Sequence, residues 1–279
     1  MPARDAWSRA VVENHVLMDL GLTDRACIIT GGSRGIGLMT ARQLVAEGAK
    51  LLLIGRGEEA LRAAGAQLDG DVRWLSCDVT APDTGDRAVA ACLEHFGRVD
   101  VLINNASRSL TRTLEELTDQ DWRDDWEINV MAPMRLMRAA VPEMVTAGWG
   151  RVVNVSSTSG KRPGQRNVAY SVAKAAELSL SKAYADAYAR QGVLINAVTP
   201  GPVASELWLE PGGLADQTAE VRGITREQVL ESTAAGLPTG RLLGPEEVAA
   251  VIVFLCSERA SSVSGAAWSV DGGAVPVII

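Results

Sequence analysis

Thr30-Gly31-Gly32-Ser33-Arg34-Gly35-Ile36-Gly37 follows a short apolar run and opens an amphipathic segment that extends to Glu47. The spaced glycines permit a tight turn and a close approach of the backbone to a ligand. A helix that begins here presents unbonded N–H groups and the positive end of its dipole, which suit a pyrophosphate. The spacing G-x-x-x-G-x-G is a relative of the usual dinucleotide fingerprint. Between a strand and a helix it predicts dinucleotide binding, with a plain glycine-rich turn as the alternative. The residues concerned are Gly31, Ser33, Arg34, Gly35, Ile36 and Gly37.

The rest of the chain alternates short apolar runs with longer helical patterns. The runs are apolar throughout, as expected for a parallel sheet covered on both faces. The β-α-β-α order implies right-handed crossovers, so the predicted fold class is α/β: a Rossmann-like, doubly wound, parallel seven-stranded sheet flanked by helices in three α/β/α layers. The expected strands are residues 26–30, 50–54, 72–76, 99–104, 151–156, 193–198 and 266–270. The expected helices are residues 35–47, 58–68, 85–96, 121–147, 168–190 and 245–257.

One segment interrupts this alternation. Residues 201–244 are rich in proline and glycine and are too long for an ordinary connection, which is typical of a lid or a binding loop. We therefore expect an N-terminal extension at residues 1–21 and a single domain at residues 22–279. Its substrate-covering insertion spans about 202–244 and carries short helices near 213–220 and 226–234. Apolar residues near helical spacing around Trp7 and Val11 favour a short helix in the extension.

Composition argues against several classes of protein. The chain has 279 residues and a net charge of -7, and an acidic surface argues against nucleic acid or a membrane as partner. No apolar run reaches the roughly 18 residues of a membrane span, and the N-terminal segment lacks the apolar core of a secretory signal. The 4 scattered cysteines predict reduced thiols and a cytoplasmic protein. The 2 histidines belong to no ligand cluster, so no metal site is expected.

The residues at the ends of the second, third and fourth expected strands indicate which cofactor binds and where. An NAD-preferring site usually has an acidic residue after the second strand, where this chain has Gly55 and Arg56. Two guanidinium groups, those of Arg34 and Arg56, suit a 2′-phosphate, so we expect NADP(H) to be favoured over NAD(H); solvated surface arginines are the alternative. After the third strand, Asp78 offers a carboxylate to the adenine amine with Val79 against the ring, or else caps a turn. Asn105 and Ala106 end the fourth strand, at the edge where ligands bind in such sheets.

The segment Tyr170-Ser171-Val172-Ala173-Lys174 places a phenol and an ammonium four residues apart, within an alanine-rich stretch that is expected to be helical. Residues i and i+4 share a helix face, about 5–6 Å apart at Cβ. A free phenol has a pKa of ~10, and a nearby cation brings that value toward neutrality, where a proton donor or acceptor works best. The pair alone is a weak signal, but with the glycine-rich turn it predicts acid–base chemistry beside a dinucleotide.

In combination these motifs resemble the short-chain dehydrogenase/reductase superfamily over roughly residues 22–274. The matching motifs occur in order as the glycine-rich turn, Asp78, Asn104-Asn105-Ala106, Asn129, Ser157, Tyr170-x-x-x-Lys174 and Pro200-Gly201. The separation of Ser157 from Tyr170 looks like the family's usual value. The ending Val270-Asp271-Gly272-Gly273 looks like the 3-oxoacyl-ACP reductase-like branch.

The resemblance implies a role for each member of a catalytic set. Tyr170 would be the acid/base that protonates the carbonyl oxygen, and Ser157 would orient that oxygen. Lys174 would bind the nicotinamide ribose and lower the tyrosine pKa. Asn129 would hold, through a local helix distortion, a water that links Lys174 to solvent. Ser156 is the alternative to Ser157, and the spacing to Tyr170 favours Ser157.

The resemblance also implies cofactor contacts from Tyr170, Lys174, Pro200, Gly201, Val203 and Ser205. Two positions depart from the family pattern. Ser107 replaces the glycine that commonly follows Asn-Asn-Ala, which adds a Cβ and a hydroxyl near the path of the nicotinamide ribose. Ser205 stands where the family often has a threonine near the carboxamide.

These observations predict an NADPH-dependent oxidoreductase that reduces a ketone, a 3-oxoacyl or other apolar carbonyl compound, to a secondary alcohol. The alternatives are an NAD(P)+-dependent alcohol dehydrogenase and a non-catalytic dinucleotide-binding sensor. An enoyl reductase is disfavoured because related enoyl enzymes have a longer Tyr-to-Lys spacing.

Arg108 and Arg112 either meet an acidic substrate group or face solvent. The helices at 121–147 and 168–190 carry apolar faces beyond what one sheet should cover, and in the family that the chain resembles such helices form a dimeric four-helix contact. With the strand near Trp268, the resemblance implies a homotetramer, or a homodimer. Apolar side chains of the lid favour an apolar substrate: Leu207, Trp208, Leu209 and Leu214.

Overall fold

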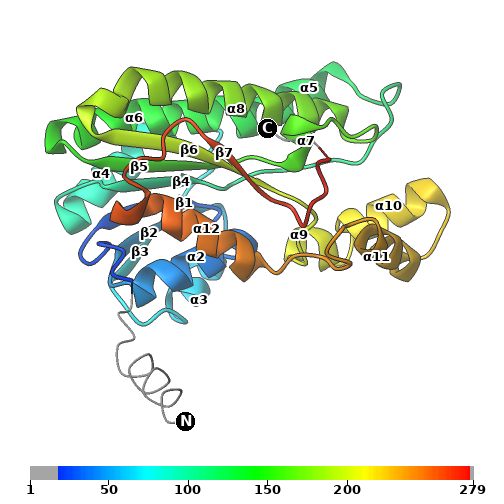
Figure 1. The fold of residues 1–279 in the computed structure, drawn as a ribbon, viewed down its shortest axis with the longest axis horizontal. Helices are drawn as coiled ribbons and strands as arrows, with labels where there is room; N and C mark the ends of the chain where they lie inside the picture. Colours follow the sequence, from blue (N-terminus) through cyan, green and yellow to red (C-terminus); the bar gives the residue numbers. More distant parts are fainter. Residues whose placement is uncertain (1–17, 277–279) are drawn as a thin grey trace, which may run out of the picture.

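The computed structural model describes residues 18–276. Within that range the chain forms one parallel sheet of seven strands in the order β3-β2-β1-β4-β5-β6-β7, which confirms the predicted doubly wound fold (Figure 1). The strand order reverses between β1 and β4, and such a switch point is where ligands bind in open α/β sheets. The strands are β1 (Ala26–Thr30), β2 (Lys50–Gly55), β3 (Val72–Ser76), β4 (Val101–Asn104), β5 (Gly150–Val155), β6 (Val193–Pro200) and β7 (Ala267–Val270).

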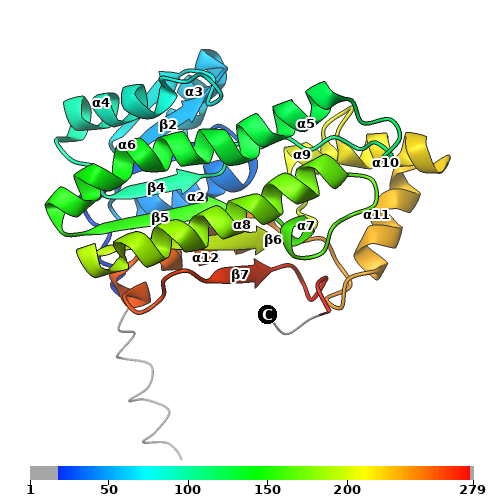
Figure 2. The same cartoon turned by 90° about the horizontal axis from the view of Figure 1, so that it is seen from above.

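Helices cover both faces of the sheet and produce the three predicted layers (Figure 2). One face carries α2 (Gly35–Ala46), α3 (Glu58–Gly65) and α12 (Pro245–Cys256). The other face carries α4 (Thr84–Phe96), α6 (Ala132–Ala147) and α8 (Val168–Tyr188). β1 and β4 lie in the middle of the sheet and are buried along their whole length, which is why their sequences are apolar at every position but the last.

The helix expected at residues 121–147 consists of three consecutive segments. The first, α5 (Asp119–Trp126), begins earlier than expected because Thr118 and Asp121 form a capping box at its N-terminus. A π-helical turn, η1 (Glu127–Met131), then leads into α6. Turns of this kind are frequent at functional sites, and this one contains Asn129.

The lid between β6 and α12 has three short helices, α9 (Glu206–Leu209), α10 (Leu214–Arg222) and α11 (Arg226–Ala235). In Figure 1 they lie together beyond the carboxyl ends of the strands, at the right of the view. The helices expected near 213–220 and 226–234 correspond to α10 and α11, whereas α9 was not expected. A β-bridge between Val203 and Leu243 joins the two ends of the lid.

Three short segments complete the fold: α7 (Thr158–Lys161) after β5, and the 3-10 turns η2 (Ala189–Gln191) and η3 (Glu258–Ala260). None of the helices within residues 18–276 combines the length and the apolar character that crossing a membrane requires. The helix expected around Trp7 and Val11 and the last residues of the apolar C-terminus lie outside the described residues.

Candidate active site

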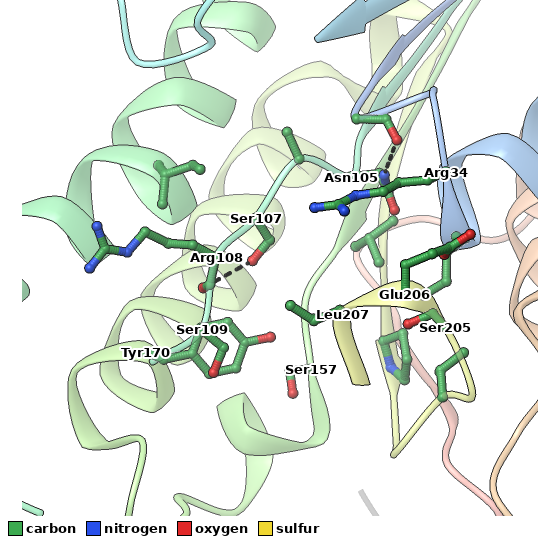
Figure 3. Close-up of a pocket in the computed structure, with 18 of the residues that line it drawn as sticks. Arg34, Asn105, Ser107, Arg108, Ser109, Ser157, Tyr170, Ser205, Glu206 and Leu207 are labelled. Carbon is green, nitrogen blue, oxygen red and sulfur yellow. Dashed lines mark hydrogen bonds between the residues drawn. The ribbon is translucent and has the colours of Figure 1, made fainter. Parts of the chain in front are cut away.

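A cavity of about 770 Å³ lies along the carboxyl ends of the strands, and its wall is formed by the loops that follow β1 to β6 (Figure 3). Of the predicted site residues, Gly37, Asn129 and Lys174 do not line it and lie behind the wall. The others all contribute to the wall: Gly31, Ser33, Arg34, Gly35, Ile36, Arg56, Asp78, Val79, Asn105, Ala106, Ser157, Tyr170, Pro200, Gly201, Val203 and Ser205.

The glycine-rich turn is braced by the end of β4. The side-chain amide of Asn105 donates to the carbonyl oxygens of Thr30 and Gly31 at 3.0 and 3.1 Å. In return, the Thr30 hydroxyl accepts from the backbone N–H groups of Asn105 and Ala106 at 2.9 and 3.0 Å. A Cβ on Gly37 would overlap the carbonyl oxygen of Gly31, so this glycine is needed for packing behind the turn. The turn is thus held rigidly in the shape that exposes its backbone to the cavity.

The N-terminus of α2 opens onto the cavity through Gly35 and Ile36. No side chain within the described residues caps this end, and the first turn contains no acidic residue. Its N–H groups and positive dipole end are therefore available to an anion, as a pyrophosphate site requires.

Arg34 is the residue before this helix, and two glutamates of the lid lie beside it. Arg34 and Arg56 both line the cavity. Arg34 donates to Glu210, the residue after α9, at 2.7 Å, with side chains that are 58% and 49% exposed. Glu206, at the start of α9, lies so close that its Oε2 would be 3.3 Å from a Cβ on Gly35. Exposed ion pairs contribute only ~0–1 kcal/mol, so a phosphate dianion can displace Glu210 from Arg34.

Asp78 adopts the turn geometry that was the alternative to adenine binding. Its Oδ1 accepts from the backbone N–H and the hydroxyl of Thr80 at 2.9 and 2.7 Å. These bonds are the main reason that the pKa of Asp78 lies below its ordinary value, with a further contribution from Arg56. Asp78 and Val79 nevertheless both line the cavity, so Asp78 caps a turn and faces the cavity at once.

Tyr170 and Ser157 lie at the end of the cavity away from Arg34 (Figure 3). Tyr170 is in the first turn of α8, and Ser157 follows β5 as the N-cap of α7, where its hydroxyl accepts from the Ser159 N–H at 3.1 Å. Ser156 is buried, and its hydroxyl donates to the carbonyl oxygen of Lys174 at 3.0 Å. Of the two candidate serines, Ser156 therefore has its hydroxyl proton engaged by α8.

Lys174 lies directly behind Tyr170. Its Nζ is 5.8 Å from the centroid of the Tyr170 ring and donates to the carbonyl oxygen of Val155 at 2.8 Å. It also donates to Glu177 Oε2 at 2.9 Å, and the side chains of Lys174 and Glu177 are each only 1% exposed. An ammonium has three N–H donors, so these contacts account for two of them.

Asn129 is fully buried in η1. Its amide nitrogen donates to the carbonyl oxygen of Asp125 at 3.0 Å, a bond made inside the distorted turn. Its Oδ1 accepts from the Ser107 hydroxyl at 2.6 Å. The serine that replaces the family glycine therefore links the cavity wall to Asn129.

The lid and the loop after β4 complete the cavity. Leu207, Trp208 and Leu214 line it, as expected, whereas Leu209 does not. Arg108 pairs with Asp124 and Asp125 at 3.0 and 3.2 Å, and Arg112 pairs with Asp121 at 2.9 Å. These ion pairs join the loop to α5. Arg108 also lines the cavity, whereas Arg112 does not.

Several residues of the site had no motif in the sequence analysis. They are the acidic residues that contact expected site residues, Glu177, Glu206 and Glu210. Glu177 had one available signal, a charged residue within the buried face of a helix, three positions after Lys174.

Known proteins match this chain over most of its length. A family model described as Enoyl-(Acyl carrier protein) reductase matches residues 31–275. The short-chain reductase protein NovJ of Streptomyces niveus is 34% identical over 254 residues, which cover 90% of this chain and 94% of that protein. The structure of L-sorbose reductase from Gluconobacter frateurii, complexed with NADPH and L-sorbose, has a TM-score of 0.86 at 33% identity and covers 94% of this chain and 100% of its own. The actinorhodin polyketide ketoreductase with NADPH has a TM-score of 0.85 at 32% identity, with coverage of 90% and 97%.

Proposed function

The chain belongs to the short-chain dehydrogenase/reductase family and is an oxidoreductase of the nicotinamide-dependent kind, and on that premise we propose that it uses NADPH to reduce a ketone to a secondary alcohol. One observation carries the proposal. Tyr170 and Ser157 line the same cavity as the glycine-rich turn and the two arginines, Arg34 and Arg56. A proton donor and a dinucleotide site that share one cavity are what carbonyl reduction requires.

The residues present fit the cofactor. The uncapped N-terminus of α2 and the turn braced by Asn105 suit the pyrophosphate, and Arg56 with Arg34 suits the 2′-phosphate. Asp78, Val79, Ala106, Pro200, Gly201, Val203 and Ser205 all line the cavity. We assign Asp78 and Val79 to the adenine and the other five to the nicotinamide. The cofactor supplies the hydride. The protein positions the cofactor and transfers one proton to the substrate.

In the proposed mechanism each catalytic residue acts through one particular group of its side chain. The Tyr170 hydroxyl gives its proton to the carbonyl oxygen, and the Ser157 hydroxyl donates a hydrogen bond that orients the same oxygen. The Lys174 ammonium favours the phenolate that Tyr170 becomes and has one N–H left for a ribose hydroxyl or a water. Asn129, held in η1, places its amide oxygen on the path from Ser107 at the cavity wall toward the interior.

The lid favours an apolar ketone or a 3-oxoacyl compound as substrate. Leu207, Trp208 and Leu214 bring apolar surface to the cavity that Tyr170 and Ser157 also line. The actinorhodin ketoreductase supports a polyketide-like substrate, and L-sorbose reductase supports a polar ketose. The compounds tested must therefore include both polyketide-like ketones and ketoses.

An enoyl reductase is the second candidate because of the description that the matching family model carries. Tyr170 and Lys174 are one helical turn apart in α8, in the spacing that resembles carbonyl reductases. We therefore place carbonyl reduction first and include an enoyl thioester in the test.

The test is loss of NADPH absorbance with simple ketones, a ketose, 3-oxoacyl thioesters and an enoyl thioester. Replacing Tyr170 by Phe removes only the hydroxyl, and we expect turnover to fall at least on the order of 100-fold because general acid catalysis is lost. Tyr188→Phe removes a hydroxyl from the same helix away from the cavity, and it should leave turnover unchanged.

NADPH binding is measured on the same proteins by nucleotide fluorescence, and Tyr170→Phe should retain it. Turnover that persists in Tyr170→Phe would contradict the proposed mechanism. Tight NADPH binding with no Tyr170-dependent turnover in either direction would instead support the dinucleotide-binding sensor.

A further inference from the structure

A polar stripe runs along the face of α8 that packs against the sheet. Tyr170, Lys174, Glu177 and Ser181 follow one another at intervals of four, three and four positions, the spacing that keeps side chains on one face of a helix. Tyr170 lines the cavity, whereas Lys174, Glu177 and Ser181 are buried at 1%, 1% and 3% exposure. Behind the expected proton donor and its lysine there is thus a buried carboxylate, to which the mechanism above gives no part.

Glu177 is fixed at both its side chain and its backbone. The carboxylate accepts from Lys174 Nζ at 2.9 Å, and the Glu177 carbonyl oxygen accepts from the Ser181 hydroxyl at 2.7 Å. Ser181 in turn accepts from Asn154 of β5 at 2.7 Å, which ties this part of α8 to the sheet. Two opposite charges removed from water at this distance form a pair in which neither partner can be lost without leaving the other uncompensated.

Because the Lys174–Glu177 pair lies close to Tyr170, the charges of the pair affect proton transfer by Tyr170. A cation 5.8 Å from the ring centroid favours the phenolate form of Tyr170. A carboxylate 2.9 Å from that same nitrogen opposes its field, because from Tyr170 the two charges act as a dipole and not as an isolated cation. A change in the charge of Glu177 therefore changes the field that Lys174 and Glu177 together exert at Tyr170.

Charged groups on the elements packed around α8 are engaged elsewhere. Within residues 18–276 no charged side chain other than Lys174 pairs with Glu177. Burial raises the pKa of the Glu177 carboxyl, and the Lys174 ammonium acts in the opposite direction. The other groups are Asp124 and Asp125 of α5, paired with Arg108, Asp121 of α5, paired with Arg112, Glu127 of η1, paired with Arg135 of α6, and Lys161 of α7, bonded to the Ala267 carbonyl, while Arg138 of α6 is exposed to solvent.

We propose that Glu177 is a positioning residue that holds the Lys174 ammonium behind Tyr170 and, by compensating its charge, sets the pH range in which Tyr170 exchanges its proton. The proposal rests on the proposed function in so far as Tyr170 is the group that transfers the proton. The charge relation among Tyr170, Lys174 and Glu177 is a property of the protein itself, so it can be measured without a substrate.

The chain contains only 3 tyrosines, which makes a direct titration possible. In a Tyr184→Phe/Tyr188→Phe protein, Tyr170 is the sole phenol, and its ionisation is read from ultraviolet absorbance as a function of pH. Glu177→Gln in this background leaves the ammonium uncompensated, and we expect the phenol pKa to fall on the order of one unit. Asp186→Asn makes the same carboxylate-to-amide change at a 64% exposed site of the same helix, and it should leave the phenol pKa unchanged.

Circular dichroism at each pH shows whether the variants are folded. Glu177→Asp keeps the charge but withdraws it by one methylene, so it should lower the phenol pKa by less than Glu177→Gln does. The alkaline limit of carbonyl reduction, which needs the protonated phenol, should move to lower pH in the same order.

An unchanged phenol pKa in both variants, or in Glu177→Asp alone where Glu177→Gln does not fold, overturns the proposal, as does a pKa that rises. A purely structural role would lower thermal stability without moving the titration. Turnover that survives Tyr170→Phe would overturn the proposed function, whereas the titration of Tyr170 would stand unaffected.

Discussion

Arg56 is the side chain on which cofactor preference should depend most. It lies on the cavity wall just after β2 and has no ion-pair partner among residues 18–276, whereas Arg34 is paired with Glu210. Hydrogen bonds to charged groups contribute ~1.5–3 kcal/mol, so Arg56→Asp should weaken NADPH binding on the order of 10- to 100-fold. NADH binding should be kept or improved, because an acid in this position accepts from the ribose hydroxyls. Fluorescence titration with both nucleotides measures the two dissociation constants.

Arg62→Asp is the matched control, since it makes the same change of charge on the exposed side of α3, away from the cavity. If Arg56→Asp and Arg62→Asp reduce NADPH affinity equally, the loss of affinity comes from the change in the net charge of the protein and not from a contact between Arg56 and NADPH. An NADPH-to-NADH preference that Arg56→Asp leaves unchanged would contradict the assignment of Arg56 to the 2′-phosphate.

Most of the residues that reach the cavity could be predicted because they follow a strand, and the ends of parallel strands meet at one edge of the sheet. Tyr170, in the first turn of α8, was predicted from its spacing to Lys174. Their partners could not be predicted, because a side-chain contact depends on packing between distant segments. Asn105 was expected at the wall and lies there, but its amide is bonded to Thr30 and Gly31. Glu177 belongs to no motif, and only its burial beside Lys174 identifies it.

Among the helices, α9 carries the contacts that should oppose cofactor binding. Glu206 and Glu210 bring carboxylates to the turn where the pyrophosphate is expected, and Glu210 occupies Arg34. Glu210→Gln removes one negative charge and frees Arg34. We expect it to tighten NADPH binding by roughly 2- to 5-fold, in keeping with the ~0–1 kcal/mol of an exposed ion pair. The gain should shrink as salt is added, because exposed charges are screened.

Glu220→Gln on α10 is the control, because it removes an exposed carboxylate from the same lid without touching Arg34. Tighter NADPH binding in both variants would reflect the overall charge of the lid alone. Weaker NADPH binding in Glu210→Gln would show that this carboxylate orients Arg34 toward the phosphate and does not compete with it.

The run from α5 through η1 to α6 shows where periodicity fails as a predictor. Its apolar pattern predicted one continuous helix, since a π turn adds a single residue to the hydrogen-bonded ring and barely disturbs the apolar face. The distortion was expected at Asn129 only from the family resemblance. The structure has it at Glu127–Met131, where Asn129 bonds to the Asp125 carbonyl and to Ser107.

Several large apolar side chains are exposed among residues 18–276, and three of them lie on elements that could form contacts between copies of the chain. Val172 of α8 and Trp126 of α5 are each 44% exposed, on helices that pack against each other. Trp268 is 36% exposed on β7, which is an edge strand of the sheet. Edge strands and exposed apolar patches are surfaces that proteins usually cover. The sequence predicted the sheet, because burial dictates its apolar strands, but the partner that covers these surfaces is not part of one chain.

We propose that copies of the chain cover them, through α5 and α8 in one interface and β7 in the other, giving a homotetramer with two kinds of two-fold contact. Val172→Arg and Trp268→Arg each place a charge in one interface, so each should reduce the assembly to dimers and their combination should give monomers. Light scattering after size-exclusion chromatography measures the mass. Val221→Arg, at a 39% exposed valine on α10, should leave the tetramer intact. A wild-type mass of one chain would overturn the assembly, and a wild-type dimer that only one of the two substitutions dissociates would leave a single interface.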